Sequence, residues 1–206
     1  MWNPNGVNIF GAPLGNQEFV DAHNEERLKD EALLWEAIPR VPDLQAAWQI
    51  LLFSANPRAN HLLRTLPPSQ SGTYAAAHDA GLWATVEALL GQLPGSLSEI
   101  KKAKNLATLP MRKGGLGLRS AFRTAPAAFW ASWADAAPIL QSKCPAVAEL
   151  LESPRDDYPG VLQELKGASQ LLQRRGFHRL PSWNDLKAGV RPESVLSAEP
   201  SEWSHG

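Results

Sequence analysis

The sequence predicts a mainly α-helical protein: an irregular helical bundle with a short β-turn segment at its N-terminus and a helical extension at its C-terminus. Apolar residues recur at three- and four-residue spacing through most of the chain, which is the period of an amphipathic helix. Prolines and glycines then divide these periodic stretches into segments of ordinary helical length. The 206 residues are enough to bury a core, either as one extended helical unit or as two small ones.

At the N-terminus, residues 7–10 are expected to form a short strand that ends in a turn over residues 11–15. Asn16 follows this turn and has a side chain suited to capping a helix. The helix is expected to continue to about Ala37, because apolar residues recur among many charges along this stretch.

The next elements are expected to be helices separated by proline. Asp43 is a suitable N-cap for a second helix, whose apolar face consists of Leu44, Ala47, Trp48, Leu51, Leu52 and Ala55. Pro57 either kinks this helix or starts its successor, which ends before Pro67. A further helix is predicted over residues 73–90, and a shorter one over residues 97–105 exposes three lysines.

A basic glycine loop precedes the next predicted helix. Arg112 and Lys113 lead into the sequence Gly114–Gly117, which permits a tight turn. Ser120 then caps a helix on which one buried stripe is expected to hold Phe122, Ala125, Phe129, Trp130 and Trp133. Arg119 and Arg123 are expected to face outward from this helix. The loop and helix together predict a cationic turn held by a packed helix.

The last third contains two more predicted amphipathic helices, over residues 145–151 and 158–175. From Gly176 the periodicity weakens, although residues 182–186 have the pattern of a short helix.

Composition limits the class of protein more than it identifies a function. The formal charge is −1, so any binding of nucleic acid must come from local basic patches. The single cysteine, Cys144, excludes an internal disulfide and a cysteine-cluster zinc site. No apolar run approaches the roughly 18 residues that span a bilayer, and the N-terminus lacks the pattern of a signal peptide. A nuclear or cytoplasmic protein without membrane contact is expected.

Three short motifs have residue types that are common at catalytic or ligand-binding sites. The glycine loop is not followed by the Gly-Lys-Ser/Thr of a phosphate-binding loop. The pair His78-Asp79 is typical of some metal-dependent phosphohydrolases, yet no other histidines lie at ligand spacing, so a helix-surface pair is the preferred interpretation. The only Asp-Asp sequence, Asp156-Asp157, lies between prolines and is interpreted as a turn that caps the next helix.

The stretch from Leu106 to Asp135 resembles the region just beyond the polymerase palm in reverse transcriptases of non-LTR (LINE-type) retrotransposons. In that family, a Leu-Pro-x-x-x-Gly-Gly-Leu-Gly-Leu sequence precedes a helix rich in Ala and Trp. Residues 10–15 resemble the primer-grip turn of the family, and residues 56–68 resemble the thumb segment that follows it. Gly176-Phe177, Pro181-Ser182-Trp183 and residues 199–206 resemble the region beyond the thumb. The order and spacing of these segments agree with the family.

The resemblance implies a residual primer-grip turn over residues 1–15, a thumb-like helical bundle over 16–136, and a post-thumb extension with an irregular tail over 137–206. The thumb would clamp RNA or an RNA–DNA duplex by its backbone, without sequence specificity. The cations that would contact phosphates are Arg58, Arg64, Lys101, Lys102, Lys104, Arg112, Lys113, Arg119 and Arg123.

The resemblance also implies that the fingers and palm of the parent polyprotein lie N-terminal to Met1. The palm carboxylates hold the catalytic Mg²⁺ of the parent polymerase, so this chain alone is expected to need no cofactor and to polymerise no DNA. The alternative from another class of function is a helical protein-interaction or scaffold module, or a decayed reading frame, without a nucleic-acid role.

Overall fold

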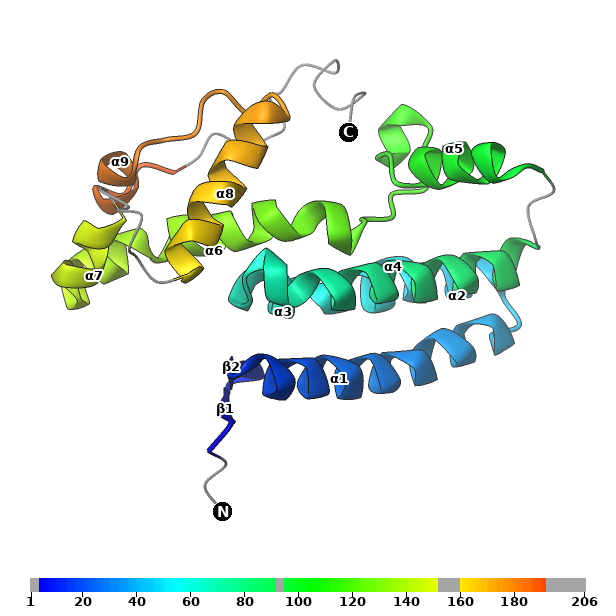
Figure 1. Ribbon diagram of the computed structural model, residues 1–206. Helices are drawn as coiled ribbons and strands as arrows, with labels where there is room; N and C mark the ends of the chain where they lie inside the picture. The colour runs from blue at the N-terminus through cyan, green and yellow to red at the C-terminus, as the bar shows by residue number, and fades with distance from the viewer. Residues whose placement is uncertain (1–3, 92–94, 152–159, 192–206) are drawn as a thin grey trace. The chain divides into compact units, whose positions relative to one another are not determined.

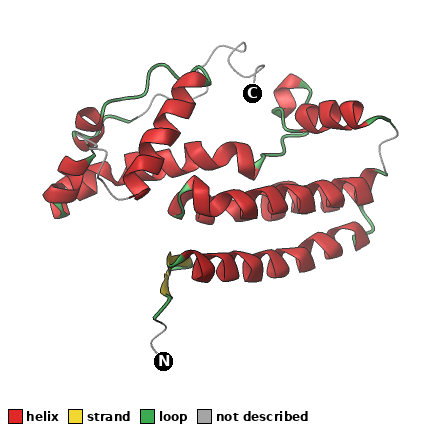
Figure 2. Cartoon of the chain, in the orientation of Figure 1, coloured by secondary structure: helices red, strands yellow, loops and turns green. Residues whose placement is uncertain are grey.

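The computed structural model describes residues 4–91, 95–151 and 160–191, and most of them lie in helices (Figure 1; Figure 2). The predicted mainly α class is confirmed. The chain forms two compact units: residues 1–66 with 70–125 make up the first, and residues 67–69 with 126–206 the second. The boundary after residue 136 that the resemblance implies stays a prediction.

The N-terminal segment is a β-hairpin. Strand β1 (Gly6–Ile9) pairs antiparallel with β2 (Ala12–Gly15), and Val7 lies opposite Leu14. The expected turn over residues 11–15 is therefore wrong in part, because residues 12–15 continue as a second strand. One face of the hairpin approaches the next helix so closely that a Cβ at Gly6 would lie 2.4 Å from the ring of Phe19. Only glycine permits this approach.

Helices α1 (Gln17–Ala37) and α2 (Leu44–Ile50) begin where the sequence predicts. The Asn16 side chain accepts a hydrogen bond from the backbone N–H of Phe19 at 2.9 Å. The Asp43 side chain accepts a hydrogen bond from the backbone N–H of Ala46 at 2.6 Å. A short 3-10 turn, η1 (Ile38–Arg40), separates the two helices. Both predicted N-caps are confirmed, because each side chain satisfies an N–H group that has no partner inside its helix.

The chain changes its helical pitch around Pro57. After α2 comes a π-helical turn, η2 (Leu51–Ala55), followed by the 3-10 turn η3 (Asn56–Ala59) and by α3 (Asn60–Thr65). Proline lacks an N–H group and fits at the start of η3. The prediction left open whether Pro57 kinks the helix or starts its successor, and the structure begins a 3-10 turn at the residue before it, Asn56.

Two further helices complete the first unit. Helix α4 (Pro68–Leu90) starts earlier than the predicted residue 73, because a proline is well accommodated in a first helical turn. Helix α5 (Leu97–Ala107) begins with a capping box between Ser96 and Glu99. The core that these elements share consists of Ile38, Ala47, Leu51, Ala55, Leu82, Val86, Ala107 and Leu118.

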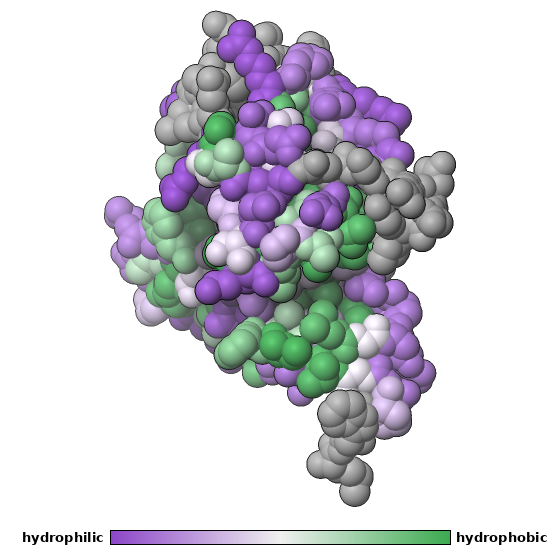
Figure 3. Space-filling view, turned by 90° about the vertical axis from the view of Figure 1, so that its left-hand side faces the viewer, coloured by the Kyte–Doolittle hydropathy of each residue, from purple (hydrophilic) through white to green (hydrophobic). Residues whose placement is uncertain are grey.

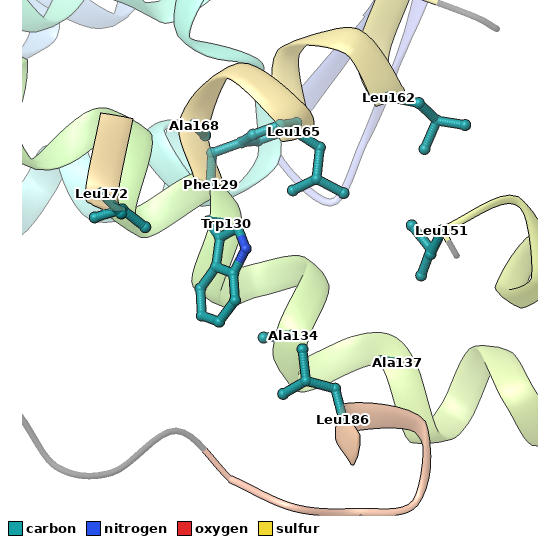
Figure 4. Packing of buried hydrophobic residues seen from close by; sticks show 10 residues of the cluster. All are labelled: Phe129, Trp130, Ala134, Ala137, Leu151, Leu162, Leu165, Ala168, Leu172 and Leu186. Atoms are coloured by element: carbon teal, nitrogen blue, oxygen red, sulfur yellow. The ribbon is translucent and has the colours of Figure 1, made fainter. Parts of the chain in front are cut away.

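The second unit has a core of its own. Helix α6 (Ala121–Lys143) enters this unit at Pro126, and α7 (Pro145–Leu150), α8 (Gly160–Arg174) and α9 (Trp183–Lys187) follow. Trp130 lies among the leucines of α8 and α9, and its ring centroid is 5.9 Å from that of Trp183 (Figure 4). The other side chains drawn there are Phe129, Ala134, Ala137, Leu151, Leu162, Leu165, Ala168, Leu172 and Leu186.

Candidate nucleic-acid interface

The basic glycine loop is a locked turn. Arg112 and Lys113 lie in a 3-10 turn, η4 (Met111–Lys113), that ends at Gly114. Gly114 has φ 78° and Gly117 has φ 73°, both in the left-handed region that favours glycine. A Cβ at Gly115 would lie 2.1 Å from the carbonyl oxygen of Leu109, so the backbone leaves no room for a side chain there. The turn therefore requires these three glycines.

The N–H groups of this loop bind inside the loop. Those of residues 113–118 donate to the carbonyl oxygens of Ala107, Leu109, Pro110 and Met111 at 2.8 to 3.3 Å. A phosphate-binding loop instead directs its N–H groups outward to the ligand. The preferred interpretation of the glycines as a structural turn agrees with this geometry.

Two polar side chains from earlier in the chain hold the loop to the bundle. Asn56 accepts a hydrogen bond from the backbone N–H of Arg119 at 3.1 Å and donates its amide to the Arg119 carbonyl at 2.9 Å. Asp79 accepts from the Ser120 hydroxyl and the Ala121 N–H, each at 2.6 Å, and from the Phe122 N–H at 3.2 Å. The loop is thus fixed at the point where α6 begins.

The start of α6 agrees only in part with the predicted cap and buried stripe. Ser120 caps the helix as predicted, because its hydroxyl accepts from the N–H of Arg123 at 3.1 Å. Phe122 was expected in the buried stripe but is 57% exposed. The interpretation of His78-Asp79 as a helix-surface pair is also wrong, since His78 is fully buried and Asp79 caps α6.

The nine predicted phosphate-contacting cations all lie in the first unit, where they fall into two groups. Arg58 and Arg64 lie on η3 and α3, and the others lie on α5 and from the glycine loop into α6. Figure 1 shows α3 and α5 at opposite ends of α4. The exposed members are Arg64, Lys101, Lys102, Lys104, Arg112 and Arg119, whereas Arg58, Lys113 and Arg123 are half-buried.

Two members of the larger group make specific contacts with the bundle. The Lys104 ammonium lies 5.0 Å from the centroid of the Trp83 ring, within the range of a cation–π contact. The Arg123 guanidinium donates to the Thr108 hydroxyl at 3.3 Å. These contacts fix part of each side chain against the protein surface.

Arg58 has mixed surroundings. It lines a pocket of about 370 Å³. The same pocket is lined by Arg27, which is also positively charged, and by the acidic Glu26 and Asp30. The remaining lining residues are Asn8, Gly11, His23, His61 and Leu62. The acidic side chains oppose the cations, so this pocket is less suited to a phosphate than the glycine loop is.

A buried polar cluster lies between α1 and α4, and it was not among the predicted sites. Glu31 is fully buried, and its carboxylate accepts from the Tyr74 hydroxyl at 2.8 Å and from Arg27 Nε at 3.2 Å. Its second oxygen lies 2.7 Å from His78 Nδ1. One signal was available: position 31 falls on the apolar side of α1, where a carboxylate needs a partner.

The pKa values of Glu31 and Tyr74 are shifted in opposite directions. Burial raises the pKa of Glu31, but the hydrogen bond and charge of His78, the Tyr74 hydroxyl and the Arg27 charge outweigh it, so the Glu31 pKa lies below its ordinary value. Burial is also the largest cause of the raised pKa of Tyr74, and the adjacent Glu31 carboxylate raises it further. Tyr74 therefore remains a hydrogen-bond donor at neutral pH.

Within the described ranges, no three His, Cys, Asp or Glu residues are arranged to hold a metal ion. No helix among these residues is both long and apolar enough to cross a membrane. Asp156-Asp157 and residues 199–206 lie outside the part of the chain that the structure describes.

The surface also carries an apolar area over the hairpin. Phe10 at the turn is 96% exposed, and Val7, Ile9 and Leu14 are each about half exposed. Figure 3 shows an apolar area in the lower part of the face that it presents. Exposed apolar groups gathered in one place are typical of a protein-contact surface.

No family model, curated protein or solved structure matches the chain.

Proposed function

We propose that this chain is the thumb-like region of a LINE-type reverse transcriptase and that it holds template–primer nucleic acid by its phosphate backbone. The observation that best supports the proposal is the locked glycine loop, which holds Arg112 and Lys113 on a fixed turn. A preformed cationic turn loses little conformational entropy when it contacts a phosphate.

The chemistry of the interface suits phosphates better than bases. Lys101 and Lys102 are exposed on α5, the helix that leads into the loop. Lysine and arginine bind phosphate oxygens without regard to sequence. Because the whole chain has a formal charge of −1, attraction to nucleic acid would be confined to this basic region. Weak, sequence-independent binding is the expected behaviour.

The salt dependence of binding tests the proposal. Fluorescence anisotropy with a labelled RNA–DNA hybrid would compare the parent chain with the double variant Arg112→Ala/Lys113→Ala over a range of salt concentrations. Each lost phosphate contact should reduce the slope of log affinity against log salt by about 0.9 for B-form DNA, which serves as a guide for the hybrid. The matched control is Arg174→Ala/Arg179→Ala, which removes two exposed cations of the second unit.

The proposal predicts that the loop variant flattens the slope and weakens binding to all sequences alike, while the control variant retains the parent slope. Circular dichroism should be unchanged in both. Absence of binding at low salt would contradict the proposal, and so would an equal effect of the two variants. A loop variant that binds as well as the parent would also contradict the role of Arg112 and Lys113.

The proposed role is binding without catalysis by this chain. Purified protein with a primed template, deoxynucleotides and Mg²⁺ or Mn²⁺ should give no extension above the level of buffer. Template-dependent extension would overturn the assignment to a thumb region.

A second candidate function is a helical protein-interaction module, which the exposed apolar face of the hairpin favours. If the chain is such a module, replacing Phe10 and Leu14 with Ser should abolish its association with a protein partner, and the parent chain should not bind the hybrid. Binding of the hybrid by the parent chain, lost only in the loop variant, would favour the clamp.

A further inference from the structure

The buried cluster of Glu31, Tyr74 and His78 has no part in the proposed phosphate contacts. It lies between α1 and α4, and all three side chains are almost completely excluded from solvent. Burial of ionisable groups is unfavourable unless hydrogen bonds and opposite charges compensate for the lost hydration. The hydrogen bonds around His78 indicate which form of its ring the protein holds.

Both ring nitrogens of His78 face oxygen atoms that accept hydrogen bonds. Nδ1 lies 2.7 Å from Oε2 of Glu31, and Nε2 lies 3.3 Å from the carbonyl oxygen of Asn56. A neutral imidazole carries one N–H group, so it can donate to only one of these oxygens. An imidazolium carries two and can donate to both.

The other arrangement would place the proton on Glu31, which would then donate to His78. Two donors from other side chains disfavour it, because the Tyr74 hydroxyl and Arg27 Nε already donate to the same carboxyl group. Such donors stabilise the ionised carboxylate. The indole of Trp35 lies edge-on to the His78 ring at a centroid distance of 5.7 Å, and it neither gains nor loses a proton.

Asn56 extends this chain of contacts to the basic segment. Its carbonyl faces His78, while its side chain holds both the N–H and the carbonyl of Arg119. The next residue after His78, Asp79, caps α6 at Ser120 and Ala121. Two consecutive residues of α4 thus contact, through Asn56 or directly, the segment that joins the glycine loop to α6.

We propose that His78 is an imidazolium in the folded protein. Its hydrogen bond to the Asn56 carbonyl then fixes Asn56, whose side chain in turn positions the segment beginning at Arg119. Loss of the proton leaves one ring nitrogen with its lone pair toward an acceptor oxygen. The contact of His78 with Asn56 or with Glu31 is then lost, and the grip of Asn56 on Arg119 loosens. This device does not depend on the proposed function.

The protonation state is tested on the unmodified full chain by NMR of the histidine ring nitrogens at neutral pH. Both nitrogens of His78 should show the shifts of protonated, N–H-bearing nitrogens. His61 provides the internal comparison, because its side chain is exposed to solvent whereas that of His78 is buried. One nitrogen of His78 with the shift of an unprotonated ring nitrogen would overturn the proposal.

The coupling is tested by hydrogen exchange at the Arg119 amide, corrected for the intrinsic pH dependence of exchange. As the pH rises and the His78 ring signals change, this exchange should accelerate by about tenfold, the effect of losing one hydrogen bond of typical net strength. The variant His78→Gln should remove the pH-dependent step, whereas His61→Gln should retain it.

Hydrogen exchange of the unmodified chain tests the coupling even if the variant His78→Gln does not fold. An Arg119 amide that keeps its protection while His78 loses its proton would overturn the coupling. Loss of the proton only together with global unfolding would overturn it as well, since no separate release of the segment would then exist.

Discussion

Gly81 of α4 lies directly against the indole ring of Trp35 in α1. A Cβ at position 81 would be 2.3 Å from Cζ3 of that ring, which is closer than two carbon atoms can approach without a shift of one of them. The ring of Trp35 also packs against the core of the first unit. The glycine therefore sets how closely these two helices pack.

Replacing Gly81 with Ala should destabilise the protein by about 1 to 3 kcal/mol, the usual effect of overpacking a core. Gly72 in the same helix is the matched control, because a Cβ there meets no atom within 4 Å. Gly72→Ala should stabilise the protein by about 0.4 to 1 kcal/mol by reducing the freedom of the unfolded chain. Urea denaturation measures both values, and equal effects would contradict the close packing at position 81.

Removing the Asp79 side chain should weaken the start of α6. Asp79→Ala is expected to lower the free energy of unfolding by about 1 to 2 kcal/mol, because the N–H groups of Ala121 and Phe122 lose their acceptor. Glu36→Ala on the exposed side of α1 should change it by less than about 0.5 kcal/mol. An Asp79 variant as stable as the Glu36 variant would show that Ser120 alone caps the helix.

Trp130 and Trp48, which lie at the centres of predicted apolar stripes, should contribute unequally to the free energy of unfolding. Trp130 is 4% exposed, and its replacement by Ala should cost about 3 to 5 kcal/mol. Trp48 is only half-buried, so the same change should have a smaller effect. Chemical denaturation of both variants checks this order. A loss of unfolding free energy below about 1 kcal/mol for Trp130→Ala would show that Trp130 is not a core residue.

The lowered pKa of Glu31 makes part of the stability dependent on pH. The folded state favours the carboxylate, so this stabilisation is complete above the ordinary value of 4.5 and is lost as the pH falls through the lower folded-state pKa. At neutral pH, Glu31→Gln should lower the free energy of unfolding by about 3 kcal/mol, because it leaves His78 without its charged partner.

In acid the difference between Glu31→Gln and the parent should narrow, since the parent carboxylate also gains a proton. Denaturation curves at neutral and acidic pH provide the measurement, with exposed Glu36→Gln as the control. A difference in the free energy of unfolding that stays constant across this pH range would mean that the charge of the Glu31 carboxylate does not cause the loss of stability.

The local signals of the sequence predicted most of the helices. Asn16, Asp43 and Ser120 each cap a helix at the predicted position, because a capping side chain accepts hydrogen bonds from backbone N–H groups within three residues of it. The second strand of the hairpin was missed, since Pro13 and two glycines are more typical of a turn than of a strand.

The contacts that organise the candidate site could not be predicted in the same way. Asn56 and Arg119 are 63 residues apart, and nothing in the residues around either one indicates the other. Periodicity placed Phe122 in the buried stripe, yet Ala121 is the buried residue of that turn and the ring of Phe122 is exposed. Contacts between polar residues far apart in the sequence organise this site, and the spacing of residues along the chain does not predict them.

The two separate cores affect how unfolding can be observed. Of the tryptophans in the described residues, Trp35, Trp48 and Trp83 pack against the first core, whereas Trp130, Trp133 and Trp183 belong to the second. Intrinsic fluorescence therefore averages over both units, and two transitions of similar midpoint would merge into one broad curve. Chains that retain tryptophan in only one unit, with phenylalanine elsewhere, would let each core report its own melting.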